Sequence, residues 1–230
     1  QKGGLLYCGG TATLSGGTYT GNSGKYGGVA YNNGGIFVSQ DVLFDGNTAT
    51  GGSSTSRDGG GVLCIQGGSV TSTNDIFINN MSTVSAGGAI LINGSTSSTV
   101  FTVNSSTFSK NSSKLWGGAV SMGGNSNGVT LILNAATFTE NKSTSGAGGA
   151  IDVQSGGIIF STNSIFEGNK ATGSYSDGGT QAGNSVSLGD LVQRHRSALL
   201  HAQSDVDHVI IKDLGKTPIF GIFLRELFKT

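Results

Sequence analysis

Short apolar runs alternate with Gly, Asn, Ser and Thr through the first three quarters of the chain. Residues 148–169 show the pattern best, with apolar runs at 150–151, 158–160 and 165–166. Runs of this length that alternate apolar and polar positions are typical of β-strands. The Gly and Asn residues between them accept the backbone of tight turns at low cost. The pattern therefore predicts strands joined by turns, and no helix before about residue 188.

The three runs belong to a repeat that recurs every 25 to 33 residues. Each copy contains a glycine pair, a short apolar run and an aromatic residue followed three positions later by Asn. The aromatic and Asn positions are Tyr19 and Asn22, Phe44 and Asn47, Phe77 and Asn80, Phe108 and Asn111, Phe138 and Asn141, and Phe166 and Asn169. A period of this length predicts a solenoid, in which no copy buries its apolar side chains alone.

We expect an all-β parallel solenoid of about six to seven coils over residues 1–184, with three strands per coil. Stacked coils place equivalent strands about 4.8 Å apart. Phe44, Phe77, Phe108, Phe138 and Phe166 should then stack in one interior column. Asn22, Asn47, Asn80, Asn111, Asn141 and Asn169 should form a ladder of side-chain amides at a turn, as amides do in cross-β structures.

The repeat also carries a family resemblance. Gly-Gly-Ala followed by Ile or Val at residues 87–90, 117–120 and 148–151, alternating with Phe-x-x-Asn, resembles the repeats of the polymorphic outer-membrane proteins of chlamydiae. Similar repeats occur in other secreted β-helix proteins, and the resemblance covers about residues 3–169. It implies a right-handed parallel β-helix with a surface, adhesive or structural role.

The composition changes near residue 184, which suggests a second unit at 185–230. Apolar spacing predicts an amphipathic helix at 188–203, a short strand within 207–213 and a helix after Pro218. A small α/β cap over the last coil is one interpretation, because an uncovered sheet edge invites association. A docking segment for a neighbouring subunit and a poorly ordered tail are the alternatives. The residues concerned are Leu188, Leu191, Leu199, Phe220, Phe223, Leu224, Leu227 and Phe228.

The amino-acid composition argues against several classes of protein. There are 41 Gly residues without a three-residue period and a single Pro, which argues against collagen, and the formal net charge is zero. No basic cluster suggests nucleic-acid binding, and no apolar run is long enough to span a membrane. The chain starts at Gln1 without a signal peptide, which fits a processed secreted chain or a fragment of a longer protein.

Cys8 and Cys64 are the two cysteines. The repeat register places them two coils apart, about 10 Å, on opposite faces of a strand. Bridged cysteines have Cα atoms within about 7 Å, so we expect two free thiols packed as small apolar groups.

Candidate catalytic and metal-binding chemistry is sparse. Carboxylates are spread singly along the repeats, and His195 and His201 are wrongly spaced for a zinc site on one helix. A calcium site formed by Glu140 and Glu167 is an alternative to two neighbours on a solvated edge. We therefore expect no catalytic residues, no resident metal and no cofactor.

Asn-x-Ser/Thr triplets occur at five positions, three of them in the predicted ladder. The ladder amides are unsuited to carrying a sugar, which leaves Asn93 and Asn104 as glycosylation candidates. Thr-x-Thr pairs at 11–13, 18–20, 48–50 and 137–139 could bind ice if they formed one array, or could be solvated outward positions.

The sequence favours a non-enzymatic extracellular or cell-surface protein with a structural or adhesive role. It could be a subunit of a fibre, through head-to-tail self-association or contact with a neighbouring surface protein, and glycans are possible partners. The alternatives are a carbohydrate-acting β-helix enzyme and an ice- or glycan-binding module.

Overall fold

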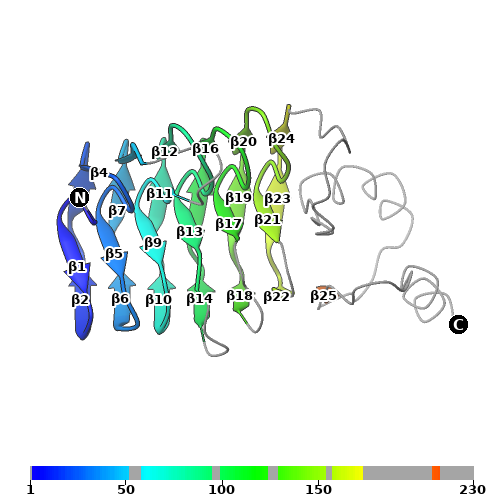
Figure 1. Cartoon of the computed structure of the whole chain (residues 1–230). Helices are drawn as coiled ribbons and strands as arrows, with labels where there is room; N and C mark the ends of the chain where they lie inside the picture. Colours follow the sequence, from blue (N-terminus) through cyan, green and yellow to red (C-terminus); the bar gives the residue numbers. More distant parts are fainter. Residues whose placement is uncertain are drawn as a thin grey trace, which may run out of the picture.

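The chain forms a parallel β-solenoid that extends along one axis (Figure 1). The computed structural model describes residues 2–51, 58–94, 99–123, 129–153, 157–172 and 209–212. Every regular element within these ranges is a β-strand. The predicted all-β parallel solenoid is therefore confirmed. Within the same ranges there is no helix that could span a bilayer.

Four sheets run along the solenoid, and each takes one strand from each of six successive repeats. Sheet 1 contains β1 (Leu6–Cys8), β5 (Ala30–Asn32), β9 (Leu63–Ile65), β13 (Ile90–Ile92), β17 (Val120–Met122) and β21 (Ile151–Val153). Sheet 2 contains β2 (Thr11–Ser15), β6 (Ile36–Gln40), β10 (Ser69–Thr73), β14 (Val100–Asn104), β18 (Thr130–Asn134) and β22 (Ile158–Thr162), followed by β25 (Val209–Lys212).

The other two sheets have shorter strands. Sheet 3 contains β3 (Thr18–Thr20), β7 (Leu43–Asp45), β11 (Ile76–Ile78), β15 (Thr107–Ser109), β19 (Thr137–Thr139) and β23 (Ile165–Glu167). Sheet 4 contains β4 (Ser23–Gly24), β8 (Thr48–Ala49), β12 (Met81–Ser82), β16 (Ser112–Ser113), β20 (Lys142–Ser143) and β24 (Lys170–Ala171).

The prediction of three strands per coil is wrong, because each repeat has a fourth. The three apolar runs correspond to sheets 1, 2 and 3, as expected. The strands of sheet 4 are only two residues long and follow the ladder Asn directly. Two residues cannot show an alternating pattern, so only their parallel pairing with the neighbouring repeats identifies them as strands.

Equivalent residues stack in register, so alternate positions of each strand form inward and outward columns. In sheet 2, for example, Phe101 pairs with Val70 and Leu131, and all three are buried. Inward side chains of sheets 1, 2 and 3 form one continuous hydrophobic core along the solenoid. Each strand thus contributes only one or two core side chains, and stability depends on stacking the repeats.

The glycine pairs sit where the backbones of neighbouring repeats come closest. A Cβ at Gly118 would overlap the carbonyl oxygen of Gly149 and lie 2.5 Å from the backbone nitrogen of Lys142. The Gly118 N–H also donates to the carbonyl of Gly148 at 2.9 Å. The second glycine of each pair is therefore required by close packing of the main chain.

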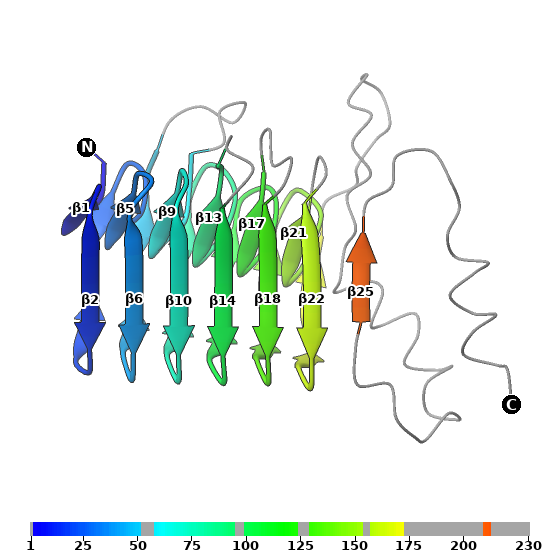
Figure 2. The ribbon, with the colours of Figure 1, turned by 90° about the horizontal axis from the view of Figure 1, so that it is seen from below.

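Sheet 2 extends beyond the last repeat. β25 pairs antiparallel with β22, with Ile159 opposite Ile211 (Figure 2). This strand lies within residues 207–213, where the sequence predicted one. The boundary near residue 184, the helix at 188–203 and the helix after Pro218 lie outside the described residues.

Candidate functional site

Aromatic side chains stack along the interior in one column. Phe77 and Phe108 have ring centroids 4.5 Å apart with an interplanar angle of 2°, and Phe108 and Phe138 are 4.7 Å apart at 4°. Tyr19 and Phe166 occupy the two ends of the column and are only partly buried. Phe44, Phe77, Phe108 and Phe138 therefore lie buried in the core.

The Asn residues three positions later form a hydrogen-bonded ladder. From Asn47 onward, Oδ1 of each Asn accepts from the backbone N–H and from Nδ2 of the Asn in the preceding repeat, as Asn141 does from Asn111, both at 3.0 Å. The Nδ2 of Asn111 also donates to the carbonyl of Phe77 at 2.9 Å. The same pattern links Asn22, Asn47, Asn80, Asn111, Asn141 and Asn169. These amides are committed to the backbone, so the ladder has a structural role.

The residue before each ladder Asn adopts a left-handed conformation in all six repeats. Three repeats place Gly there, whereas Asn79, Lys110 and Glu140 occupy it in the others with φ of 54–55°. Lys110 and Glu140 also form an exposed ion pair at 3.7 Å. The Glu140 backbone N–H donates to the carbonyl of Glu167, so these two acidic residues lie in neighbouring repeats. Among the described residues, no group of three or more His, Cys, Asp or Glu could hold a metal ion.

A second ladder uses threonine hydroxyls and was missed in the sequence. The hydroxyl of Thr83 donates to the carbonyl of Ala49 at 3.1 Å, and Thr144 donates to Ser113 at 3.2 Å. Thr50 and Thr172 make the equivalent bonds. The signal was present, because each of these Thr residues stands three positions after a ladder Asn.

Asp75 lies at the centre of a buried polar network that sequence reasoning also missed. Its Oδ2 accepts from Ser39 Oγ at 2.5 Å and from Ser72 Oγ at 2.6 Å, and its Oδ1 accepts from the Val42 N–H. Ser106 Oγ accepts from the Asp75 N–H at 3.0 Å. Burial raises the pKa of this carboxyl, although the hydrogen bonds oppose the shift. Its partners are serine hydroxyls and the backbone, so the arrangement fits a structural crosslink between repeats.

Both cysteines are buried free thiols. Cys8 in β1 pairs with Asn32 in β5, and Cys64 in β9 pairs with Tyr31 in β5. The two cysteines therefore lie two strands apart in sheet 1, and their positions along the strands differ by one residue. Cys64 belongs to a second apolar cluster on the outward side of sheet 1, where Tyr26 and Trp116 also pack. Burial there raises the pKa of the Cys64 thiol to about 12.

The outward face formed by the six parallel strands of sheet 2 carries no charged residue. Its three columns contain nine Ser or Thr residues, six Ile, Val or Phe residues and three amides, with no charge at any of the positions. The first column is Thr11, Ile36, Ser69, Val100, Thr130 and Ile158; the second is Thr13, Val38, Thr71, Thr102, Ile132 and Phe160; the third is Ser15, Gln40, Thr73, Asn104, Asn134 and Thr162.

Ile36 and Phe160 are 50% and 41% exposed, so this face is open to solvent at large apolar side chains. The six strands lie side by side and aligned (Figure 2). A flat, uncharged, partly apolar face of this kind is typical of contact surfaces.

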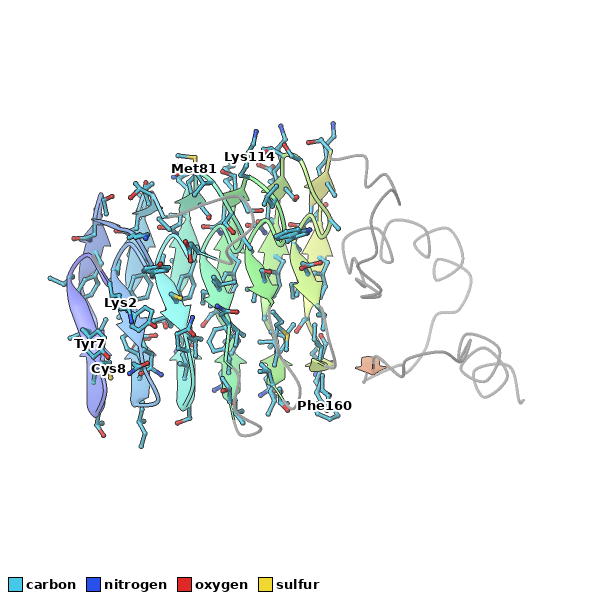
Figure 3. All side chains as sticks on the ribbon, viewed as in Figure 1. Lys2, Tyr7, Cys8, Met81, Lys114 and Phe160 are labelled. Carbon is cyan, nitrogen blue, oxygen red and sulfur yellow. The ribbon has the colours of Figure 1, made fainter. Side chains whose placement is uncertain are left out.

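The side formed by sheet 4 has the opposite character, because lysines gather on it. Lys142 and Lys170 pair in register, and Lys114 lies one repeat earlier. A shallow depression of about 230 Å³ lies beside Lys114 and Met81, which is 41% exposed. Met81 and Lys114 lie at the rim of the solenoid opposite Phe160 (Figure 3). The depression has one cationic side chain and otherwise hydroxyl and apolar neighbours.

The glycosylation candidates differ in their surroundings. Asn93 follows β13 directly and is half-buried, and its backbone N–H donates to the carbonyl of Ile65. Asn104 lies on the outward face of sheet 2, where its Oδ1 accepts from Asn134 Nδ2 at 2.9 Å. Both amides thus stand at or near the surface. The assembly or cap residues proposed between Leu188 and Phe228 lie outside the described residues.

The Thr-x-Thr pairs do not form one array. Thr11 and Thr13 face outward from sheet 2, whereas Thr18 and Thr20 belong to sheet 3 and Thr48 begins a strand of sheet 4. Thr137 and Thr139 return to sheet 3. The pairs therefore lie on three sides of the solenoid.

Comparison with known proteins identifies one repeat. The model of the Chlamydia polymorphic membrane protein repeat matches residues 99–122. This segment contains β14, β15, β16 and β17, and hence one complete turn of the solenoid with Phe108 and Asn111. The resemblance that the sequence predicted is confirmed for this repeat. No curated protein and no solved structure matches the chain.

Proposed function

We propose that this chain is a structural or adhesive repeat protein of the cell surface or extracellular space. The observation that carries the proposal is the match of residues 99–122 to a membrane-protein repeat. In the structure, that segment forms one turn of the stacked solenoid. The Phe column and the Asn ladder make the stack a rod that presents long faces to its surroundings.

The proposal includes self-association head to tail, or contact with a neighbouring surface protein. It is supported by the exposed apolar side chains of the terminal repeats. Leu5 and Tyr7 in the first repeat and Ile165 in the last are 58%, 53% and 57% exposed. In the first repeat these side chains lie beside strand edges that no described strand covers, and such edges associate readily, whereas β25 covers β22 in the last repeat. The right-handed winding, the total of six to seven coils, the cap at 185–230 and glycans on Asn93 or Asn104 belong to the same proposal.

The two alternatives have weaker support. A carbohydrate-acting enzyme would need carboxylates gathered on one face, whereas Asp75 is buried among serines and Glu140 pairs with Lys110. An ice-binding module would need its Thr-x-Thr pairs on one side, and they lie on three sheets. The repeat match favours a surface role over both.

Surface location is tested on intact cells that produce the protein. An antibody against the purified chain should label unpermeabilised cells, and external protease should remove the labelled material. Labelling that requires permeabilisation would contradict the proposal. Negative-stain electron microscopy of the purified chain at high concentration tests assembly, since end-to-end contact predicts filaments and uniform single rods would exclude it.

A further inference from the structure

We propose that the outward face of sheet 2 pairs with the same face of a second copy of this chain, in an antiparallel two-fold dimer. The inference rests on the self-association proposed above, but it concerns a side of the solenoid and not its ends. Its first support is composition. The six parallel strands have no charged residue at any outward position, and Lys212, which pairs with Ile158, belongs to β25 beyond them. Sheets 3 and 4, in contrast, carry Asp45, Glu167, Lys142 and Lys170 at their outward positions.

The second support is self-complementarity. A two-fold axis parallel to the strands keeps each column opposite itself and reverses the order of the repeats. In the first column, it places Thr11 opposite Ile158, Ile36 opposite Thr130 and Ser69 opposite Val100. Every pair then joins a hydroxyl residue with an aliphatic one. Small and large side chains alternate across the contact, as close packing of two surfaces requires.

The other two columns obey the same symmetry. In the second, Thr13 faces the largest residue, Phe160, and Val38 faces Ile132. Thr71 and Thr102 face each other nearest the axis. In the third column all pairs are polar with polar, namely Ser15 with Thr162, Gln40 with Asn134 and Thr73 with Asn104. Amides and hydroxyls can hydrogen-bond across such a contact. A two-fold contact of this kind is closed and self-limiting.

The size of the face limits the strength of the contact between two copies. Six strands about 4.8 Å apart and five residues at about 3.3 Å each give a footprint of about 500 Å² per copy. Specific interfaces bury about 800 Å² per partner, so pairing through this face should be weak and concentration-dependent. Rods held close together on a surface would meet at high local concentration, which favours such a weak contact.

The dimer is tested by sedimentation equilibrium over a wide concentration range. The parent chain should show an average mass that rises with concentration. The double variant Thr71→Lys and Thr102→Lys places four like charges near the two-fold axis and should weaken association at least tenfold. The control is Thr107→Lys with Thr137→Lys on the outward face of sheet 3, where both threonines are also half-buried. Circular dichroism checks that both variants keep the fold.

A proximity measurement uses single cysteines at the same positions. Chains with Thr71→Cys should be crosslinked by a short bismaleimide to chains with Thr102→Cys, since facing sheets pack about 10 Å apart. The parent chain is the blank, because Cys8 and Cys64 are buried. Three results would each overturn the pairing. They are a monomer at every concentration, an equal loss of association in the sheet 3 control, and binding of a neutral polysaccharide without self-association. Filaments that persist in the Thr71/Thr102 lysine variant, with no crosslinked pair, would overturn the face contact and leave end-to-end assembly standing.

Discussion

Asn80 donates twice to the same atom of Asn111. Its backbone N–H and its Nδ2 both reach Asn111 Oδ1 at 3.0 Å, and both residues are fully buried. A single side-chain oxygen thus satisfies two donors of the neighbouring repeat. This geometry holds the turn of one repeat against the turn of the next.

Replacing Asn111 with Ala should destabilise the chain by about 3–5 kcal/mol. The change removes four hydrogen bonds in a buried site. The backbone N–H and Nδ2 of Asn80 lose their acceptor, and the Phe77 carbonyl and Asn141 Oδ1 each lose a donor. Asn22 ends the ladder and is only partly buried, so Asn22→Ala should cost about 1 kcal/mol. Urea unfolding followed by circular dichroism measures both. Equal losses in the two variants would argue against a ladder that stabilises the interior repeats.

Gly118→Ala should be severely destabilising, by more than about 3 kcal/mol. The added methyl group would overlap the backbone of Gly149 and Lys142, which cannot move without separating the repeats. Gly10→Ala is the matched control, because a Cβ there meets nothing within 4 Å. It should change the free energy of unfolding by no more than about 0.5 kcal/mol. A thermal unfolding scan compares the two, and a well-folded Gly118→Ala chain would disprove the close-packing requirement.

Lys110→Gly should stabilise the chain relative to Lys110→Ala by about 1 kcal/mol. Lys110 has φ of 54°, a conformation that costs an L-residue about 1–2 kcal/mol and costs Gly little. Both variants remove the exposed ion pair with Glu140. The difference between their unfolding free energies therefore reports the cost of the left-handed backbone conformation. The midpoint of urea unfolding is the measurement. An Ala variant as stable as the Gly variant would show that the left-handed position carries no strain.

The Asp75→Asn variant should alter the pH dependence of stability. Burial raises the pKa of Asp75 above its ordinary value of 3.8, so the folded chain retains this proton to higher pH than the unfolded chain. The contribution of Asp75 to stability is therefore greatest below pH 3.8 and declines as the pH rises through the folded pKa. The difference in unfolding free energy between the Asn variant and the parent should change between pH 3.8 and the folded pKa and stay constant above that pKa. A difference that is constant at every pH would show that the pKa is not raised.

Neither thiol should react in the folded chain. Cys8 and Cys64 are 4% and 0% exposed, and the pKa of Cys64 is raised to about 12, so its reactive thiolate is scarce at neutral pH. Ellman's reagent at pH 8 should detect no thiol before unfolding and both thiols in urea. A thiol that reacts at once in the native chain would place that cysteine at the surface.

The repeat was readable from the sequence because each position has a strong local reason. Phe-x-x-Asn marks a core side chain followed by a turn amide, and a glycine pair marks close backbone contact. These signals predicted the parallel solenoid and the separation of the cysteines, and a separate apolar run predicted a strand within residues 207–213. They did not reveal sheet 4, since Met81-Ser82 and Lys142-Ser143 share no residue type except the serine.

The sequence by itself determined that stacked strands bury one aromatic column, because that property repeats at every turn. Outside the Phe column and the Asn ladder, only the tertiary structure decided which residues from different repeats become neighbours. Ser39, Ser72, Asp75 and Ser106 come from three repeats and meet only when the strands are in register. Likewise, Thr13 and Phe160 belong to one uncharged face only because sheet 2 aligns repeats at opposite ends of the solenoid. Register is set by hydrogen bonding between repeats, and no single repeat contains that information.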